Sequence, residues 1–237
     1  MQPTIVLVHG AFADSASWDG VIYPLGRAGH LVIAAANPLR GVAADAAAVS
    51  DLVATIDGPV VLVAHSYGGA VITNVAADAG DIAGLVYVAA FAPEPGESAF
   101  TLAGMFPGST LGDSLQPVAR GDGATDLYIA AERFHEQFCA DVAAGQAARM
   151  AATQRPVTQE ALVEATGERP LWKELPSWFV FGELDRNIPV ELERFMAKRA
   201  RAHRTLEIPG ASHAVSVAHP DATAHLILEA AALRVAA

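Results

Sequence analysis

The chain has 237 residues, which is enough for one domain with an inserted subdomain. Hydrophobic residues make up 52% of it, so we expect a large packed core rather than disorder. The net charge of −11 makes nucleic acid and anionic lipid poor partners, and we expect binding to neither nucleic acid nor membrane.

Cysteine content and the first residues bear on the cellular compartment. Cys139 is the single cysteine, so no intrachain disulfide can form. Residues 1–10 lack a basic region, and the apolar run Ile5–Val8 is too short for the core of a signal peptide. No segment approaches the ~20 consecutive apolar residues of a membrane span. We therefore expect a cytoplasmic protein.

Short β-branched runs alternate with longer helical patterns along most of the chain. We predict strands at Thr4–Val8, Leu31–Ala35, Val60–Ala64, Leu85–Ala90, Ser177–Phe181 and Thr205–Ile208. We predict helices at Trp18–Ala28, Ala43–Ile56, Tyr67–Ala79, Val190–Arg201 and Pro220–Val235. Apolar strands that are each followed by a helix predict an α/β fold, a doubly wound and mostly parallel sheet with helices on both faces. Ligands of such sheets bind beyond the carboxyl ends of the strands.

The alternation stops between residues 93 and 173, where prolines and glycines precede helical patterns near Asp126–Cys139 and Val142–Thr153. The segment shows no convincing strand and is too long for a loop in a compact domain. We interpret residues 93–173 as a helical lid inserted after the fourth strand, and residues 1–92 and 174–237 as the core. Extra packing on one edge of the sheet is the alternative.

The strongest motif surrounds Ser66, in Ala64-His65-Ser66-Tyr67-Gly68-Gly69. A serine on a tight turn between a strand and a helix has an exposed hydroxyl and a strained backbone, as a nucleophile requires. The positions two before and two after the serine crowd together, so they need small residues. Gly68 meets that need, and Ala64 stands where glycine is commoner. A serine that merely caps the helix is the alternative.

A serine nucleophile needs a base, and the base needs a carboxylate that orients it. His213 follows the last predicted strand, and Asp185 follows the fifth. His219 and Glu183 are their rivals, but His219 begins the final helix and the position of Glu183 gives it less reach. The order Ser66, Asp185, His213 is that of the α/β-hydrolases.

Attack on an ester carbonyl creates an oxyanion, which two preorganised N–H donors stabilise. We assign one donor to the backbone N–H of Tyr67, the residue after the nucleophile. The other is assigned to Ala11, in the loop after the first strand, where Gly10 lets the backbone approach closely. No dinucleotide or phosphate-binding loop is present, and no histidine pair has metal-ligand spacing, so we predict no metal site.

At these motifs the sequence resembles the α/β-hydrolase superfamily, and within it the small esterases related to plant methyl-ester esterases and hydroxynitrile lyases. The resemblance covers nearly the whole chain. Its softer matches are at residues 5–11, 89–93, 185–189 and 210–213. It implies a six-stranded sheet that lacks the first hairpin of larger relatives, and no cofactor. Hydroxynitrile lyases of this kind have threonine and lysine where this chain has Gly10 and Ala214, which favours ester hydrolysis.

We expect an apolar pocket for a small, largely apolar ester, with Phe12 and Phe91 bordering it. Four other aromatic residues are weaker candidates for the lining: Trp18, Phe106, Phe134 and Trp172. The predicted function is a carboxylesterase that forms an acyl-enzyme. A lyase of hydroxynitrile or C–C bonds on the same fold, and a slow-turnover receptor for a small molecule, are the alternatives. The partner is then a small-molecule ester, and the protein is a monomer or homodimer.

Overall fold

A computed structural model describes residues 1–233 of the chain. Six strands form one sheet in the order β2-β1-β3-β4-β8-β9, and each pairs with its neighbours in parallel. They are β1 (Thr4–Val8), β2 (Val32–Ala35), β3 (Pro59–Ser66), β4 (Asp81–Ala90), β8 (Ser177–Gly182) and β9 (Arg204–Ile208). The predicted α/β fold and its six strands are confirmed.

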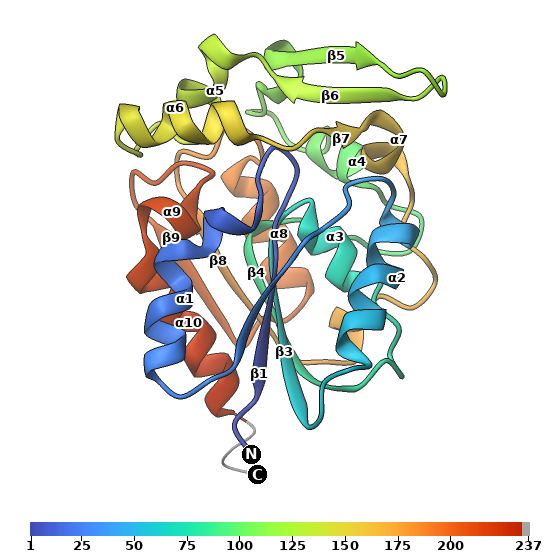
Figure 1. The fold of residues 1–237 in the computed structure, drawn as a ribbon, viewed down its shortest axis with the longest axis vertical. Coiled ribbons are helices and arrows are strands. Elements are labelled where there is room, and N and C mark those ends of the chain that lie inside the picture. The colour runs from blue at the N-terminus through green and yellow to red at the C-terminus, as the bar shows by residue number, and fades with distance from the viewer. Residues whose placement is uncertain (234–237) are drawn as a thin grey trace.

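Helices cover both faces of this sheet, which explains why a strand such as β1 is buried along its whole length. Figure 1 shows α1 and α10 on one face and α2 and α3 on the other. The helices of the core, with one 3-10 turn, are η1 (Ser15–Trp18), α1 (Asp19–Arg27), α2 (Val42–Val53), α3 (Gly68–Thr73), α8 (Val190–Arg199), α9 (Val215–Ala218) and α10 (Pro220–Ala232). No helix within residues 1–233 is long and apolar enough to cross a membrane.

One predicted helix ends well before its predicted last residue. The helix after Ser66 stops at Thr73 rather than Ala79, because the Asn74 side chain donates to the carbonyl of Ala70 and competes with the backbone for the last turn. The predicted end of the final helix at Val235 lies outside the described residues.

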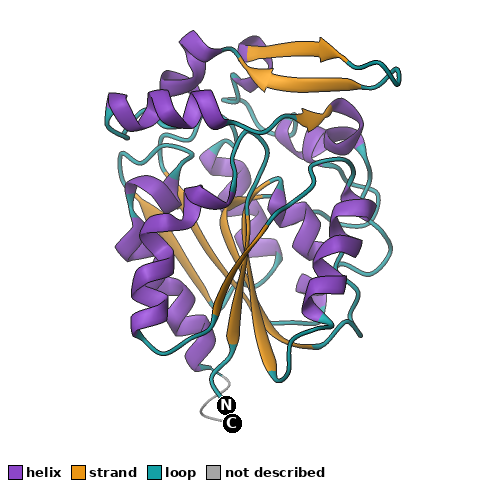
Figure 2. Ribbon diagram, viewed as in Figure 1, coloured by secondary structure: helices purple, strands orange, loops and turns teal. Residues whose placement is uncertain are grey.

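Residues 93–173, called the insert below, lie over the carboxyl ends of the strands (Figures 1 and 2). The expectation of a purely helical segment is wrong, because the insert also contains an antiparallel sheet in the order β5-β6-β7 (Figure 2). Its elements are α4 (Ala99–Ala103), η2 (Leu111–Ser114), β5 (Leu115–Ala119), β6 (Thr125–Ile129), α5 (Ala131–Phe138), α6 (Ala144–Thr153), β7 (Val157–Thr158), α7 (Gln159–Val163) and η3 (Leu171–Lys173).

The helix predicted from Asp126 therefore begins only at Ala131, and the residues before it form β6. Asp122-Gly123 is a turn sequence that favours a hairpin, and Gly123 has a φ of 88° there. The N–H of Arg120 donates to the carbonyl of Ala124 across this turn, which joins β5 to β6. Local turn chemistry thus overrides the helical pattern of the following residues.

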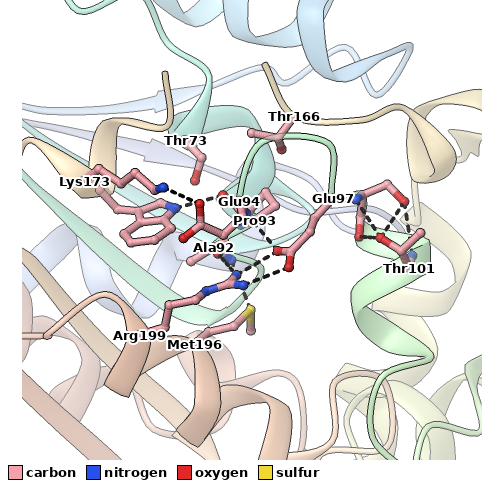
Figure 3. A network of polar contacts seen from close by, with 12 residues as sticks. Thr73, Ala92, Pro93, Glu94, Glu97, Thr101, Thr166, Lys173, Met196 and Arg199 are labelled. Atoms are coloured by element: carbon pink, nitrogen blue, oxygen red, sulfur yellow. Dashed lines mark hydrogen bonds and ion pairs between the residues drawn. The ribbon is translucent and has the colours of Figure 1, made fainter. Parts of the chain in front are cut away.

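Polar contacts join the two ends of the insert to each other and to α8 (Figure 3). Arg199 of α8 pairs with Glu97 at 2.8 Å and donates to the carbonyl of Ala92, also at 2.8 Å. The Trp172 indole donates to the carbonyl of Pro93 at 2.9 Å, so the returning chain is tied to the departing one. Burial raises the pKa of Glu97, but the hydrogen bonds from Arg199 and the Glu94 N–H outweigh it and leave that pKa lowered.

Candidate active site

Ser66 lies on a sharp turn between β3 and α3. Its φ of 55° is in the left-handed region, which a serine adopts only when the surrounding structure holds it there. A Cβ on Gly68 would lie 2.8 Å from the carbonyl oxygen of Val8, so only glycine fits at that position. Ala64 lies within β3, paired with Val8 and Tyr87, and alanine fits there in place of the commoner glycine.

The structure brings together the three side chains that the sequence singled out. The Ser66 hydroxyl lies 2.9 Å from Nε2 of His213, and Nδ1 of His213 lies 2.6 Å from Oδ2 of Asp185. Because the Asp185 carboxylate accepts, Nδ1 carries the proton, and the free lone pair of Nε2 faces the serine. This chain of hydrogen bonds can take a proton from Ser66 and stabilise the imidazolium that results.

The Asp185 carboxylate is fixed by its own loop. Its Oδ1 accepts the backbone N–H groups of Asn187 at 2.7 Å and Ile188 at 2.9 Å. Both the Asp185 and His213 side chains are fully buried. A carboxylate that is held by two N–H donors and shielded from water is preorganised to hold the imidazole ring in one orientation.

The two rivals for these roles have other partners. Glu183 accepts the N–H of Gly210, which lies in the loop before His213. His219 lies 3.1 Å from the carboxylate of Asp141, a residue of the insert. Neither rival is part of the hydrogen-bonded chain that reaches Ser66.

A second carboxyl group, that of Glu193 on α8, is fully buried in the same region. Burial raises the pKa of Glu193 well above its ordinary value, and the nearby charge of Asp185 raises it further. Both effects favour the neutral form of Glu193. The sequence pattern gave no sign that the carboxyl groups of Glu193 and Asp185 lie near each other.

Two buried histidines beside the site are also neutral. Burial lowers the pKa of His9. Burial also lowers the pKa of His65 well below its ordinary value, and the neighbouring His213 lowers it further. The N–H of Asn37 donates to Nε2 of His9, so Nδ1 donates to the carbonyl of Gly10 at 3.0 Å. Nε2 of neutral His65 donates to the carbonyl of His213 at 3.1 Å and so supports the loop that carries the base.

The loop after β1 lies against the nucleophile. A Cβ on Gly10 would lie only 2.6 Å from the Cβ of Ser66, so the glycine is what lets the two backbones approach. The N–H of Phe12 donates to the carbonyl of Arg155 at 3.0 Å and is committed to the insert. Ala11 and Tyr67, the two predicted oxyanion donors, both line the cavity that contains Ser66.

That cavity has a volume of about 490 Å³, and Phe12 and Phe91 are among the residues that line it. The insert supplies much of the remaining surface, including Phe100, Leu111, Leu115 and Leu162. Among residues 1–233, no charged side chain lines the cavity. Sequence reasoning missed the aliphatic lining because Leu115 and Leu162 lie in elements whose position over the sheet depends on the fold of the insert.

The four weaker aromatic candidates lie elsewhere. Trp18 and Phe134, the latter in the insert, are fully buried among other hydrophobic side chains. Phe106 packs against Phe195, and the Trp172 indole donates to the carbonyl of Pro93. Burial among hydrophobic side chains, which is the commoner fate of an aromatic residue, explains the first two. Within the described part of the chain, no group of three or more His, Cys, Asp or Glu side chains is arranged to hold a metal ion.

Comparison with known proteins agrees with this architecture. The chain is 28% identical to a pyrethroid hydrolase of Sphingobium wenxiniae, over 95% of this chain and 86% of that protein. The crystal structure of polyneuridine aldehyde esterase superposes with a TM-score of 0.80 at 19% identity, over 97% of this chain and 99% of that one. A methylesterase from Arabidopsis superposes with a TM-score of 0.79 at 14% identity, over 98% and 99% of the two chains.

The resemblance to plant esterases of this superfamily is thus confirmed at the level of the fold. The model of the alpha/beta hydrolase family matches residues 5–226, which is nearly all of the sequence. The chain therefore belongs to the alpha/beta hydrolase family.

Proposed function

We propose that the protein is a carboxylic ester hydrolase that works through an acyl-enzyme on Ser66. The observation that carries the proposal is the hydrogen-bonded chain from Ser66 through His213 to Asp185, which opens into an apolar cavity. A serine that only capped a helix would direct its hydroxyl to a backbone N–H of that helix, whereas the Ser66 hydroxyl lies against the buried imidazole of His213.

The first half of the reaction forms the acyl-enzyme. Oγ of Ser66 attacks the ester carbonyl carbon while Nε2 of His213 takes its proton. The N–H groups of Ala11 and Tyr67 stabilise the oxyanion of the tetrahedral intermediate. When that intermediate collapses, the bond to the alcohol oxygen breaks, and His213 returns the proton to the departing alcohol.

The second half releases the acid. A water molecule gives a proton to His213 and attacks the acyl carbon, and collapse of the second intermediate breaks the bond to Ser66. The proton on His213 then returns to Oγ. In both halves Asp185 accepts the Nδ1–H of His213 and so holds the imidazole ring in the same orientation.

The cavity supports an uncharged, largely apolar ester as the substrate. Its lining is mostly apolar, and a carboxylate or ammonium group placed there would lose its hydration without gaining an opposite charge. The name of the Sphingobium relative, a pyrethroid hydrolase, describes activity on esters of this general character. We therefore propose neutral esters with an apolar acyl or alcohol part.

The lyase alternative is less well supported by the oxyanion loop. A threonine at the position of Gly10 would place its Cβ 2.6 Å from Cβ of Ser66 and 2.7 Å from the His65 carbonyl oxygen. Since side chains do not approach that closely, the loop is built for glycine. This supports ester hydrolysis over the cleavage of hydroxynitriles.

A panel of esters tests the proposal. 4-Nitrophenyl esters of increasing acyl length are compared with matched esters that carry a free carboxylate, using the unmodified protein and Ser66→Ala. We expect turnover of the neutral esters, much weaker turnover of the charged ones, and none above background in Ser66→Ala. Undiminished turnover in a folded Ser66→Ala would overturn the assignment, as would turnover of mandelonitrile without turnover of any ester.

A further inference from the structure

The loop that carries the proposed base is held by a residue of the insert. His213 lies between β9 and α9, outside any helix or strand, so its position depends on contacts made by its neighbours. Asp141 follows α5, and its carboxylate contacts Ser212, the residue just before His213. One oxygen of its carboxylate accepts the N–H of Ser212 at 3.2 Å, and the other accepts the Ser212 hydroxyl.

This contact extends to both sides of the loop. The Oγ of Ser212 also accepts the N–H of Ala214 at 3.3 Å, so Ser212 spans the residue between them, which is His213. On the far side, Nε2 of His219 lies 3.1 Å from the same Asp141 carboxylate. Asp141 thus joins the start of the loop to the start of α10.

The core supplies the other restraints on the base. Asp185 binds the imidazole ring, and His65 binds the backbone carbonyl of His213. Among the described residues, Asp141 is the residue of the insert that hydrogen-bonds to this loop. The ring of Phe138, also from the insert, packs edge-on against the imidazole of His213, with 5.1 Å between the two ring centroids.

We propose that Asp141 is a positioning residue for His213, so that the base is correctly placed only when the insert is docked on the core. The inference rests on the proposed ester hydrolysis. Asp141 does not touch the substrate cavity, and its effect is transmitted through Ser212. The insert then has two roles at one site, since it supplies much of the substrate lining and also fixes the base.

The two kinetic constants separate this role from simple support of the fold. His213 moves protons in both halves of the reaction, so a misplaced base slows acylation and deacylation together. In that case kcat falls while KM changes little. We expect Asp141→Ala to lower kcat between about tenfold and about a hundredfold, the range for a shift of up to about 1 Å in a reacting group, with KM within about twofold.

Asp126→Ala is the matched control. Asp126 also belongs to the insert, and its carboxylate pairs with Arg40 of the core at 2.5 Å. Its side chain is 16% exposed, and that of Asp141 is 20% exposed. Losing either carboxylate removes a contact between the insert and the core, but only Asp141 contacts the loop of the base. We expect Asp126→Ala to keep kcat within about twofold.

Two further variants test the route through Ser212. In Asp141→Asn the amide oxygen can still accept the Ser212 hydroxyl. The amide NH2 group replaces the oxygen that accepts the N–H of Ser212 and cannot accept it. This variant should therefore retain part of the activity. Ser212→Ala should be less harmful in the Asp141→Ala background than alone, because the two residues act through one contact. If Asp141→Ala does not fold, Asp141→Asn and the single variant Ser212→Ala provide the same comparison of kcat and KM with Asp126→Ala.

The measurement is kcat and KM on a neutral 4-nitrophenyl ester, with the folded fraction of each variant from circular dichroism. A lower kcat in Asp141→Ala than in Asp126→Ala, with partial rescue by Asn, supports the proposal. Equal kcat in the two alanine variants, or a change confined to KM, overturns it while the proposed function stands. If the unmodified protein turns over no ester, the proposed function fails and the inference fails with it.

Discussion

Nε2 of His213 lies 2.9 Å from Oγ of Ser66, although 147 positions separate the two residues in the chain. Ser66 ends the central strand β3, and His213 follows the edge strand β9. Parallel strands end at the same edge of a sheet, so loops that are far apart in sequence meet there. The fold, rather than local sequence, thus creates the contact on which the proposed chemistry depends.

Replacing Asp185 tests the orientation of the base. In Asp185→Asn the amide can donate to His213 and favour the wrong tautomer, so we expect kcat to fall by roughly 10³–10⁴-fold with the fold intact. The rival carboxylate provides the control, because Glu183 binds the N–H of Gly210 and not the imidazole. Glu183→Gln should leave kcat within a few fold, and the reverse ranking in steady-state assays would exchange the two assignments.

Substitution of Gly10 tests the close approach of the oxyanion loop to the nucleophile. The new Cβ in Gly10→Ala would meet Ser66 Cβ at 2.6 Å, so the loop must shift and the Ala11 N–H with it. Loss of one oxyanion donor costs roughly 10²–10³-fold in kcat. Gly26→Ala is the matched control, because nothing lies within 4 Å of its added Cβ. Equal activity of the two variants would show that the loop does not act in this way.

The buried Glu193 makes a prediction about stability and pH. Its pKa is raised in the folded protein, so folding binds a proton, and the stability that this gives is lost as pH rises towards the folded pKa. Relative to the unmodified protein, Glu193→Gln should gain about 1.4 kcal/mol of unfolding free energy per pH unit between the unfolded pKa and the raised folded pKa of Glu193. Urea unfolding at several pH values measures this. A difference between the two proteins that is independent of pH would show that Glu193 is ionised when folded.

The parts of the structure that could be predicted are those set by local patterns. The apolar strands, the turn at Ser66, and the order of Ser66, Asp185 and His213 each have a signature within a few residues. The prediction of helix from Asp126 is wrong for strand β6, because the helical pattern of the residues after it also fits Asp126–Ile129. The turn at Asp122-Gly123, a known hairpin signal, pointed the other way.

Contacts between residues that are far apart in the sequence or lie in different elements could not be predicted. The sequence around Asp141 gives no indication that its side chain contacts Ser212. The sequence around Glu193 likewise gives no indication that its carboxyl group lies near Asp185. Their environments arise only when the insert docks and α8 packs beneath the site. Leu162 likewise joins the substrate cavity because of where α7 lies over the sheet.

The most direct test of the account is the formation of an acyl group on Ser66. Rapid mixing with a 4-nitrophenyl ester, quenching in acid, and mass spectrometry of the peptide that contains Ser66 measure it in one experiment. We predict that the mass of this peptide increases by that of the acyl group in the unmodified protein, and not in Ser66→Ala. Ester turnover by the unmodified protein with the acyl group on another residue, or with equal labelling of Ser66→Ala digests, would contradict the account.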